Sequence, residues 1–313
     1  MNNTCIIGDA TLYCGDVLEC LAALPDESVH CCVTSPPYWG LRDYGVPGMI
    51  GLEPTFQEWL DKMVAVCREI RRVLRKDGTF WLNCGDCYAN PSQPGGGDPT
   101  IKNRNIGDKK YPLKPLSGFK AKDLLLMPAR LAIALQTDGW WVRSEIIWAK
   151  PNPMPESVTD RPTSAHEKIY LLTKSAKYFY DADAVRERSL YPHDNRGARV
   201  AEEHKRFPTD KINGIRDSGI YENRNLRNVW TIATQPYSEA HFASFPEALP
   251  MKCIMAGSRK GDTILDPFSG AATTGLVALK LDRRYIGIEL NPDYIAMSIK
   301  RIEMEARQER LFT

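Results

Sequence analysis

The chain has 313 residues, of which 43% are hydrophobic and 26% are charged. These fractions are typical of a soluble globular protein and exclude an intrinsically disordered one. The 41 Lys and Arg residues nearly balance the 39 Asp and Glu residues, which excludes a uniformly basic nucleic-acid binder but allows a local basic patch. No apolar run approaches the roughly 18 residues of a membrane span, so we expect no membrane partner.

The nine cysteines predict free thiols rather than disulfides or a metal site. Their number is odd, and most of them lie inside apolar runs, such as Cys31 and Cys32. Cys84 and Cys87 form a C-x2-C pair, but a structural zinc ion needs four ligands, and no second Cys or His pair stands at a suitable spacing. Because no secretory signal is visible either, we expect a cytoplasmic protein that holds no metal.

Seven short apolar or β-prone runs are predicted to be strands, and they cover 10–14, 28–34, 78–83, 141–148, 168–173, 263–265 and 285–289. Four helical segments are predicted between or after these strands. They are one helix from about Thr55 to Asp77–Gly78, a helix or helix pair over 123–136 with a kink near Pro128, one helix over 271–281 and one over about 292–310. This alternation predicts an open, doubly wound α/β sheet.

Two stretches do not fit the alternation. Residues 91–122 are rich in Gly and Pro and carry seven Lys or Arg residues against two Asp residues, which predicts a basic loop. Residues 183–229 are polar with little apolar periodicity, which predicts an insertion. The main domain would then consist of residues 1–182 and 230–313.

The segment DPFSGAATTG, residues 266–275, follows a predicted strand and opens a predicted helix. Small residues at such a turn let the backbone approach a ligand closely. Glu289 ends the next strand, where its carboxylate can accept both hydroxyls of a ribose. With only Gly270 and Gly275, the turn lacks the G-x-G-x-x-G dinucleotide pattern. These residues favour a nucleoside without phosphates, and an ordinary strand-to-helix turn is the alternative.

The segment TSPPYW, residues 34–39, follows another predicted strand, at the edge where open α/β sheets bind ligands. Its two prolines donate no N–H, so their carbonyls and the Ser35 hydroxyl can accept hydrogen bonds. Tyr38 and Trp39 offer faces on which a planar ring can stack. Together these groups fit an amino group on a flat heterocycle, and a rigid Pro-Pro turn with buried aromatics is the alternative.

The two segments together resemble the motifs of DNA amino-methyltransferases, which use S-adenosylmethionine to methylate the exocyclic nitrogen of cytosine or adenine. In that family [S/D/N]-P-P-[Y/F] is the catalytic motif and D-P-F-x-G-x-G-T-T holds the cofactor. The catalytic motif comes first here, which resembles the β class, with a circularly permuted, seven-stranded, Rossmann-like sheet and an inserted target-recognition region. The resemblance covers most of residues 8–182 and 228–297, and one departure is Ala272, where the family usually has Gly.

The resemblance implies a bacterial or phage-encoded enzyme and a role for each motif. The implied catalytic residues are Ser35, Pro36, Pro37 and Tyr38. The implied cofactor-binding residues are Asp16, Thr34, His241, Phe242, Asp266, Pro267, Phe268, Ser269, Gly270, Thr273, Thr274, Glu289 and Leu290. The alternatives are a solvated turn for Asp16 and core packing for His241 and Phe242.

The target base is stacked in a duplex, so it must be flipped out. Within the family, Ser in the first motif position is typical of cytosine-N4 enzymes and Asp or Asn of adenine-N6 enzymes. We therefore expect cytosine N4, with adenine N6 as the alternative. The sequence contains no Pro-Cys dipeptide, which disfavours carbon-5 methylation through a cysteine nucleophile. A DNA-binding protein without enzymatic activity is the alternative from another class, but it would not need both motifs.

Double-stranded DNA is the expected partner, and a homodimer is allowed. We expect the basic loop to be mobile without DNA and to contact phosphates through Lys102, Arg104, Lys109 and Lys110. We expect the insertion to read the target sequence, and the candidate base contacts are Arg196, Arg199, Arg224 and Arg227, with Trp39 beside the catalytic motif. For each of these residues, a place on the surface without a DNA contact is the alternative.

Overall fold

A nine-stranded sheet forms the centre of the computed structural model, which describes residues 3–40, 45–89, 118–189, 222–235 and 245–312. Its strands are β1 (Asn3–Ile7), β2 (Ala10–Cys14), β3 (Val29–Thr34), β4 (Leu74–Cys84), β5 (Trp141–Ala149), β6 (His166–Thr173), β9 (Val229–Thr231), β10 (Thr263–Asp266) and β11 (Arg284–Glu289). They lie in the order β1-β2-β11-β10-β3-β4-β6-β5-β9. Only β1 and β6 run against the direction of the others.

All seven predicted strands are present, and the α/β class is confirmed. The predicted number of strands is two too low, because β1 and β9 add one strand at each edge of the sheet. Neither edge strand has a strong sequence signal, since β9 spans three residues and β1 begins with two polar residues. The parallel strands at the centre end at one common edge, which is the edge where open α/β sheets bind ligands.

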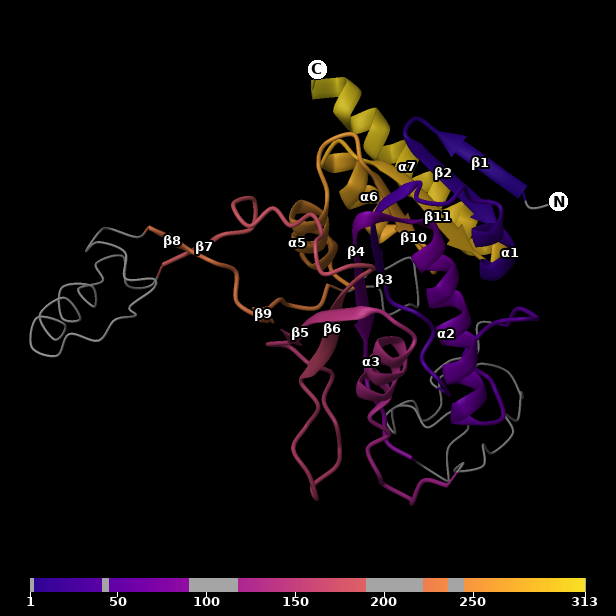
Figure 1. The fold of residues 1–313 in the computed structure, drawn as a ribbon, viewed down its shortest axis with the longest axis vertical. Helices are drawn as coiled ribbons and strands as arrows, with labels where there is room; N and C mark the ends of the chain where they lie inside the picture. Colours follow the sequence, from indigo (N-terminus) through magenta and orange to yellow (C-terminus); the bar gives the residue numbers. More distant parts are fainter. Residues whose placement is uncertain (1–2, 41–44, 90–117, 190–221, 236–244, 313) are drawn as a thin grey trace, which may run out of the picture. The chain divides into compact units, whose positions relative to one another are not determined.

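The helices form two layers, one on each face of the sheet (Figure 1). The members of one layer are α1 (Val17–Ala22), α2 (Phe56–Val73) and α3 (Met127–Thr137), and those of the other are α5 (Ala248–Gly257), α6 (Thr273–Lys280) and α7 (Pro292–Phe312). Two buried neighbours on β3 mark the two faces. Cys32 packs in the core that contains Trp59 of α2, while the Cys31 sulfur lies against Gly257 of α5.

All nine cysteines are free thiols, as predicted. Burial raises the pKa of Cys31 to about 12 and the pKa of Cys32 well above its ordinary value. Thiols in this state are protonated and unreactive at neutral pH. Among the described residues, no helix combines the length and the apolar character needed to cross a membrane.

The boundary between α2 and β4 differs from the prediction. The Thr55 side chain accepts a hydrogen bond from Glu58 N, which caps the start of α2 as the sequence suggests. The helix ends at Val73, however, and β4 begins at the next residue, so Asp77 and Gly78 lie inside a strand. The register of β3 and β4 shifts here, and a Cβ atom on Gly78 would lie 2.8 Å from the His30 carbonyl oxygen. The glycine therefore permits a close approach of two strands and does not stop the helix.

The helix predicted over 123–136 begins later, so that Pro128 lies at its start and not in its interior. It starts at Met127, and Pro128 stands in its first turn, where a missing N–H costs no hydrogen bond. The residue before the helix, Leu126, adopts a left-handed conformation with φ 54°.

The chain forms two compact units. The larger unit consists of Met1–Tyr180 and Asn228–Thr313, and the smaller unit of Asp181–Arg227. Within the smaller unit, β7 (Glu187–Arg188) pairs with β8 (Asn223–Arg224). The limits of the smaller unit lie two residues before those of the predicted insertion.

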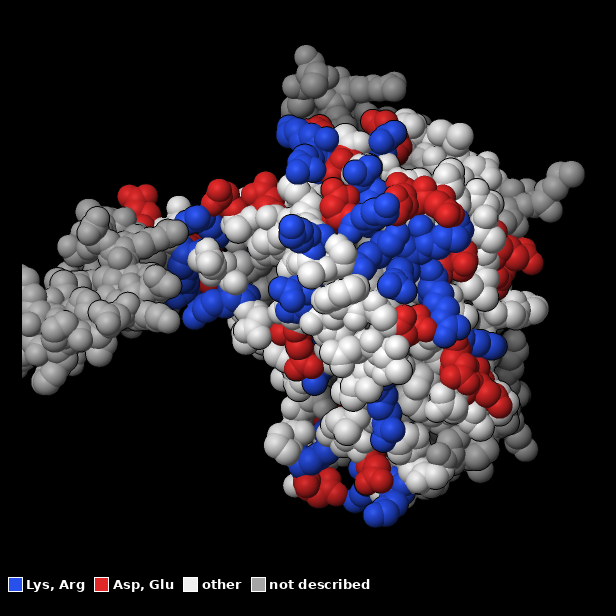
Figure 2. Space-filling view, in the orientation of Figure 1, with Lys and Arg blue, Asp and Glu red and all other residues white. Residues whose placement is uncertain are grey.

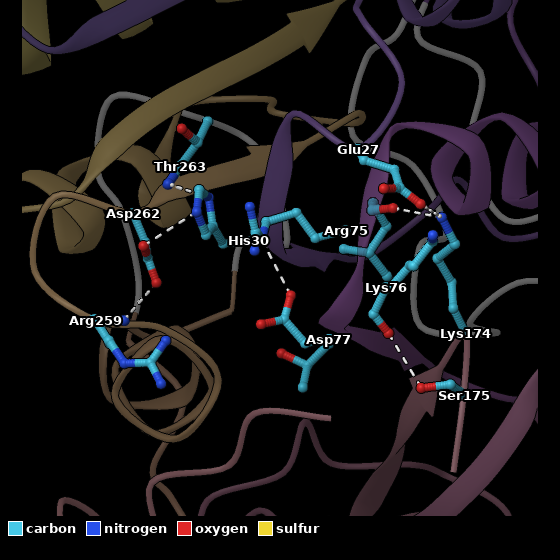
Figure 3. A network of polar contacts seen from close by, with 12 residues as sticks. Glu27, His30, Arg75, Lys76, Asp77, Lys174, Ser175, Arg259, Asp262 and Thr263 are labelled. Atoms are coloured by element: carbon cyan, nitrogen blue, oxygen red, sulfur yellow. Dashed lines mark hydrogen bonds and ion pairs between the residues drawn. The ribbon is translucent and has the colours of Figure 1, made fainter. Parts of the chain in front are cut away.

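A polar network surrounds His30 at the edge of the sheet where β3 and β10 begin (Figure 3). His30 Nδ1 accepts a hydrogen bond from Thr263 N at 3.1 Å, and Nε2 lies 3.2 Å from the Asp262 carboxylate. Nδ1 can accept only when it carries no proton, so the ring is neutral. Burial lowers the pKa of His30 against the opposing attraction of Asp262.

We expect the stability of the His30→Asn variant to fall less on acidification than that of the wild-type protein. The unfolded chain protonates His30 near pH 6.5, whereas the folded chain resists it, so the stability contributed by neutral His30 is lost as the pH falls below about 6.5. An asparagine oxygen can still accept from Thr263 N but does not titrate. Melting temperatures of both proteins between pH 7.5 and 5 provide the measurement. Parallel curves would contradict this assignment of the neutral state.

Figure 2 shows Lys and Arg side chains gathered over part of the larger unit, with Asp and Glu side chains among them. At the edge of the sheet where the central strands begin, several basic residues are paired with acids. Arg75 lies 3.0 Å from Asp77, and Arg72 lies 2.6 Å from Asp26. Because this edge is opposite to the one that carries both motifs, we do not assign the paired charges to DNA binding.

Candidate active site

The two motifs are joined by a buried hydrogen bond. β3 and β10 are parallel neighbours, so the residues that end them lie side by side. Thr34, the last residue of β3, donates its hydroxyl to Asp266 Oδ1 at 2.6 Å. Ser35 follows Thr34 directly, so the expected catalytic motif starts beside the expected cofactor turn.

Asp266 is a buried acceptor at the junction of three elements. Besides Thr34, it accepts from Thr274 Oγ1 at 2.7 Å on α6 and from Phe268 N at 3.1 Å in the turn. Burial raises the pKa of Asp266 to about 6, although these hydrogen bonds oppose the shift. Since both carboxylate oxygens are occupied and the residue is 2% exposed, Asp266 holds the turn in place from beneath it.

The turn before α6 presents its backbone closely. Gly270 has φ +50°, and no atom lies within 4 Å of the place where a Cβ atom would stand. Ala272 also adopts a left-handed conformation, with φ 57°, directly before the helix. This geometry explains why the family usually has Gly at that position, because a side chain makes the conformation costly.

Glu289 connects the ends of β10 and β11. Its Oε2 accepts from Gly270 N at 2.9 Å, and its Oε1 accepts from Asn291 N at 2.8 Å. Each oxygen keeps a second lone pair, and the side chain is only partly buried, so a ribose diol can still be accepted. Burial raises the pKa of Glu289. Together with the open space at Gly270, these acceptors fit a nucleoside.

The remaining cofactor candidates fall into two groups. Three of them have polar partners inside the fold. The Ser269 hydroxyl lies 2.8 Å from Tyr285 Oη, and the Thr273 hydroxyl accepts from Arg301. The Asp16 carboxylate caps α1 by accepting from Leu18 N and Glu19 N. Pro267 is buried, whereas Phe268 and Leu290 are partly exposed. His241 and Phe242 lie outside the described residues.

The Ser-Pro-Pro-Tyr segment folds back on itself. The Ser35 hydroxyl lies 3.0 Å from Tyr38 Oη, and the Pro37 carbonyl accepts from Trp59 Nε1 at 3.0 Å. Pro36 is buried. The indole of α2 thus fixes the turn against the helix layer, and the Ser35 and Tyr38 side chains meet at the edge of the sheet.

Three further residues that the sequence did not single out complete this cluster. Tyr38 Oη donates to Glu167 Oε2 at 3.0 Å, and Asn83 Nδ2 donates to the same oxygen at 2.8 Å. Lys150 forms an ion pair with the other oxygen of Glu167. Asn83 lies near the end of β4, whereas Glu167 lies at the start of β6. Because β6 is antiparallel, its first residues reach the edge where β4 ends.

The expected DNA contact at Trp39 is not supported. This side chain is 5% exposed, donates from Nε1 to the Glu53 carbonyl at 2.9 Å and packs edge-on against Phe56. An indole buried in this way cannot stack on a base. We therefore correct the assignment: Trp39 is a core residue that anchors the segment after the motif.

Of the other expected DNA contacts, only Arg224 and Arg227 are described. Both donate to Glu187 Oε2, at 3.1 and 3.2 Å. To contact guanine, the guanidinium of either arginine would have to divide its hydrogen bonds between guanine and Glu187, or break its contact with Glu187. The remaining candidates, Lys102, Arg104, Lys109, Lys110, Arg196 and Arg199, lie outside the described residues.

Comparison with known proteins agrees with the family that the two motifs resemble. The model of the N6/N4 DNA methylase family matches residues 29–300. The chain belongs to this DNA methylase family. It is 46% identical to Type II methyltransferase M.Cfr9I of Citrobacter freundii, over 96% of this chain and 89% of the relative. It is 43% identical to Type II methyltransferase M.SmaI of Serratia marcescens, over 92% and 89%. This DNA methylase is thus an enzyme that methylates DNA.

Solved structures show the same fold as this methylase. The PvuII DNA methyltransferase, which is cytosine-N4-specific, aligns with a TM-score of 0.62 at 20% identity, over 96% of this chain and 92% of that chain. The Thermus thermophilus protein TTHA0409, complexed with S-adenosyl-L-methionine, aligns with a TM-score of 0.59 at 24% identity, over 94% and 93%.

We expect Glu289→Ala to weaken binding of S-adenosylmethionine by about 1–3 kcal/mol, which corresponds to roughly 5–150-fold in Kd, because charge-assisted hydrogen bonds to the ribose are lost. Calorimetry on the folded variant measures the change. Glu58→Ala is the matched control, since it removes the same charge from an exposed position on α2. An unchanged Kd in Glu289→Ala would remove this residue from the cofactor site.

Proposed function

We propose that this DNA methylase transfers a methyl group to N4 of a cytosine that is flipped out of double-stranded DNA. The observation that carries the proposal is the hydrogen bond between Thr34 and Asp266, because it holds the start of the Ser35 motif against the cofactor turn. The methyl donor is S-adenosylmethionine, which supplies an electrophilic methyl group when bound.

In this proposal the cofactor lies over the glycine turn. Gly270 gives it room, Glu289 accepts from its ribose hydroxyls, and Phe268 and Leu290 border it. Asp266, Thr34 and Thr274 support the turn from within the fold. Holding both reactants in line removes much of the entropy cost of the reaction, roughly 7–11 kcal/mol at best.

The chain's own groups then act on the target amine. The lone pair of that nitrogen is delocalised into the ring, so it is a weak nucleophile. Hydrogen bonds from the amine to Ser35 Oγ and to the Pro36 carbonyl would draw the nitrogen toward tetrahedral geometry. The Tyr38 ring, which is partly exposed, would stack on the flipped base.

The choice of cytosine rests on Ser35 as the first residue of the motif. The PvuII DNA methyltransferase, which is cytosine-N4-specific by name, has the same fold and is compatible with this choice. Adenine N6 stays the second candidate, because a DNA adenine methyltransferase of Escherichia coli, YhdJ, is 27% identical over 94% of this chain.

For DNA binding, we propose that residues 91–122 contact phosphates and that residues 183–229 read the target sequence, as expected from their charge and position in the chain. The Type II relatives named above, both bacterial, support a modification role in a restriction–modification pair inside a bacterial cell. A homodimer stays a prediction from the sequence.

We expect DNA from cells that express the protein to contain N4-methylcytosine at one short recognition sequence. Enzymatic digestion to nucleosides followed by mass spectrometry identifies the base, and modification-sensitive sequencing gives the site. Cells that express Ser35→Ala are the control. N6-methyladenine without N4-methylcytosine would show that the choice of base is wrong while the methyltransferase assignment stands.

A further inference from the structure

Glu167 forms the end of a chain of hydrogen bonds that starts at Ser35. The two links, Ser35 Oγ to Tyr38 Oη and Tyr38 Oη to Glu167 Oε2, are both 3.0 Å long. Gly85 makes the second link possible, because a Cβ atom there would lie 2.8 Å from the Tyr38 ring. The three side chains come from β6 and from the segment after β3, so the sheet itself sets their spacing.

The direction of these hydrogen bonds follows from the chemistry of the last group. An ionised carboxylate paired with Lys150 has no proton to give, so Tyr38 must donate to Glu167. The single Tyr38 proton is then committed, and Ser35 must donate to Tyr38. One lone pair of Ser35 Oγ faces Asn83 Nδ2 at 3.4 Å, and the other is therefore left to accept from an N–H group. All donors in the chain point away from the place proposed for the target amine and toward Glu167.

The carboxylate of Glu167 is held in place by its neighbours. Asn83, which is 3% exposed, donates to Oε2 at 2.8 Å, and the Lys150 ammonium, which pairs with Oε1, also lies 4.4 Å from the centre of the Trp148 ring. The carboxylate is thus fixed at both oxygens. Burial, together with repulsion by Glu167, raises the pKa of Tyr38 well above its ordinary value. Tyr38 therefore stays neutral and passes a proton on only as it receives one.

Methyl transfer to an amine leaves a proton to be removed. The nitrogen lone pair forms the bond to the methyl carbon while the carbon–sulfur bond breaks and leaves its electron pair on sulfur. The nitrogen then carries a positive charge, and a neutral methylated amine results only when one N–H proton departs. In a flipped-out base, which is shielded from bulk water, that proton needs a route.

We propose that Glu167 is the terminal proton acceptor of the reaction, reached through the hydroxyls of Ser35 and Tyr38. The amine proton passes to Ser35 Oγ, the Ser35 proton passes to Tyr38 Oη, and the Tyr38 proton passes to Glu167 Oε2. Both hydroxyls end neutral, and Glu167 ends protonated beside Lys150. The inference rests on the proposed function, since it takes Ser35 as the residue that contacts the amine.

The test is the single-turnover rate of methyl transfer with enzyme and cofactor in excess over DNA. We expect Glu167→Gln to lower this rate roughly a hundredfold, because Gln keeps the shape but has far less affinity for a proton. Tyr38→Phe keeps the stacking ring, removes the hydroxyl and should lower the rate similarly. Since both changes break one relay, the double variant should be no slower than the slower single variant.

Readouts other than activity separate proton transfer from a structural role. The Kd values for S-adenosylmethionine and for DNA should stay within about twofold in Glu167→Gln. Glu167→Asp, which is the greater steric change, should recover part of the rate because it restores a carboxylate. Glu145→Gln is the matched control. Glu145 likewise accepts from a tyrosine, Tyr170 at 2.9 Å, and pairs with a lysine, Lys168 at 3.2 Å, but lies outside the chain of hydroxyls.

The relay is overturned if Glu167→Gln or Tyr38→Phe reacts at the wild-type rate, or if weaker DNA binding accounts for the whole loss. These outcomes leave the proposed function intact, because the wild-type protein still methylates cytosine. If the wild-type protein places no methyl group on cytosine N4, the proposed function fails, and the relay from that amine fails with it.

Discussion

Ser35→Ala should lower the single-turnover rate of DNA methylation by about 10²–10³-fold, the usual cost of removing one well-placed hydrogen-bonding group from a reacting centre. The hydroxyl lies at the end of β3, 3.0 Å from Tyr38 Oη and 3.4 Å from Asn83 Nδ2. Without it, the target amine loses its side-chain acceptor. The cofactor turn is held by Thr34 and Asp266, so the Kd for S-adenosylmethionine should not change.

Ser28→Ala is the matched control for this substitution. Ser28 directly precedes β3, at the opposite edge of the sheet from Ser35, and its hydroxyl donates to the Pro25 carbonyl at 2.7 Å. The control should methylate DNA at the wild-type rate. A Ser35→Ala protein that is folded and equally fast would show that the amine is held by other groups.

Asp266→Ala should lower the free energy of unfolding by about 3–5 kcal/mol. The substitution leaves Thr34 Oγ1, Thr274 Oγ1 and Phe268 N without their acceptor in a buried site, and each orphaned donor costs about 1–3 kcal/mol. Urea unfolding, with DNA and cofactor absent, measures the loss. A change below about 1 kcal/mol would show that the hydroxyls find other partners.

The same carboxyl also predicts a pH dependence. Its folded pKa of about 6 lies above the ordinary value of 3.8, so the folded protein holds this proton more tightly than the unfolded chain. The resulting stability is fully present below about pH 4 and is lost as the pH rises through 6. This trend is opposite to that of His30. Asp266→Asn removes the titrating group, and the difference between its stability and that of the wild-type protein should therefore change across this range.

Sequence reasoning succeeded where a general rule of sheet architecture applies. Parallel strands end at a common edge, so the motifs that follow β3 and β10 were expected at the edge of the sheet where ligands bind. The structure adds that β3 and β10 are neighbours, which brings Thr34 and Asp266 into hydrogen-bond contact. The α/β class followed from the alternation of strands and helices. The position of Ser35 beside the glycine turn depends on the pairing of β3 with β10, which the structure adds.

The rest depended on contacts that spacing does not encode. Glu167 reaches the site because β6 runs antiparallel, and no local pattern in the sequence indicates the direction of that strand. Trp39 shares its motif with Tyr38, yet the turn places one ring in the core and leaves the other partly exposed. Asp77 and Gly78 resemble a helix stop, but tertiary pairing with β3 draws them into a strand.

The adjacent thiols of Cys31 and Cys32 on β3 can report when the helix layers on the two faces of the sheet move away. Cys31 and Cys32 are fully buried and protonated, so an alkylating reagent can modify either one only after the layer that covers it has moved away. The layer is α5 for Cys31 and α2 for Cys32. Mass spectrometry of partly alkylated protein would therefore measure separately how fast each helix layer detaches from the sheet. The two residues that report these rates are neighbours in the chain.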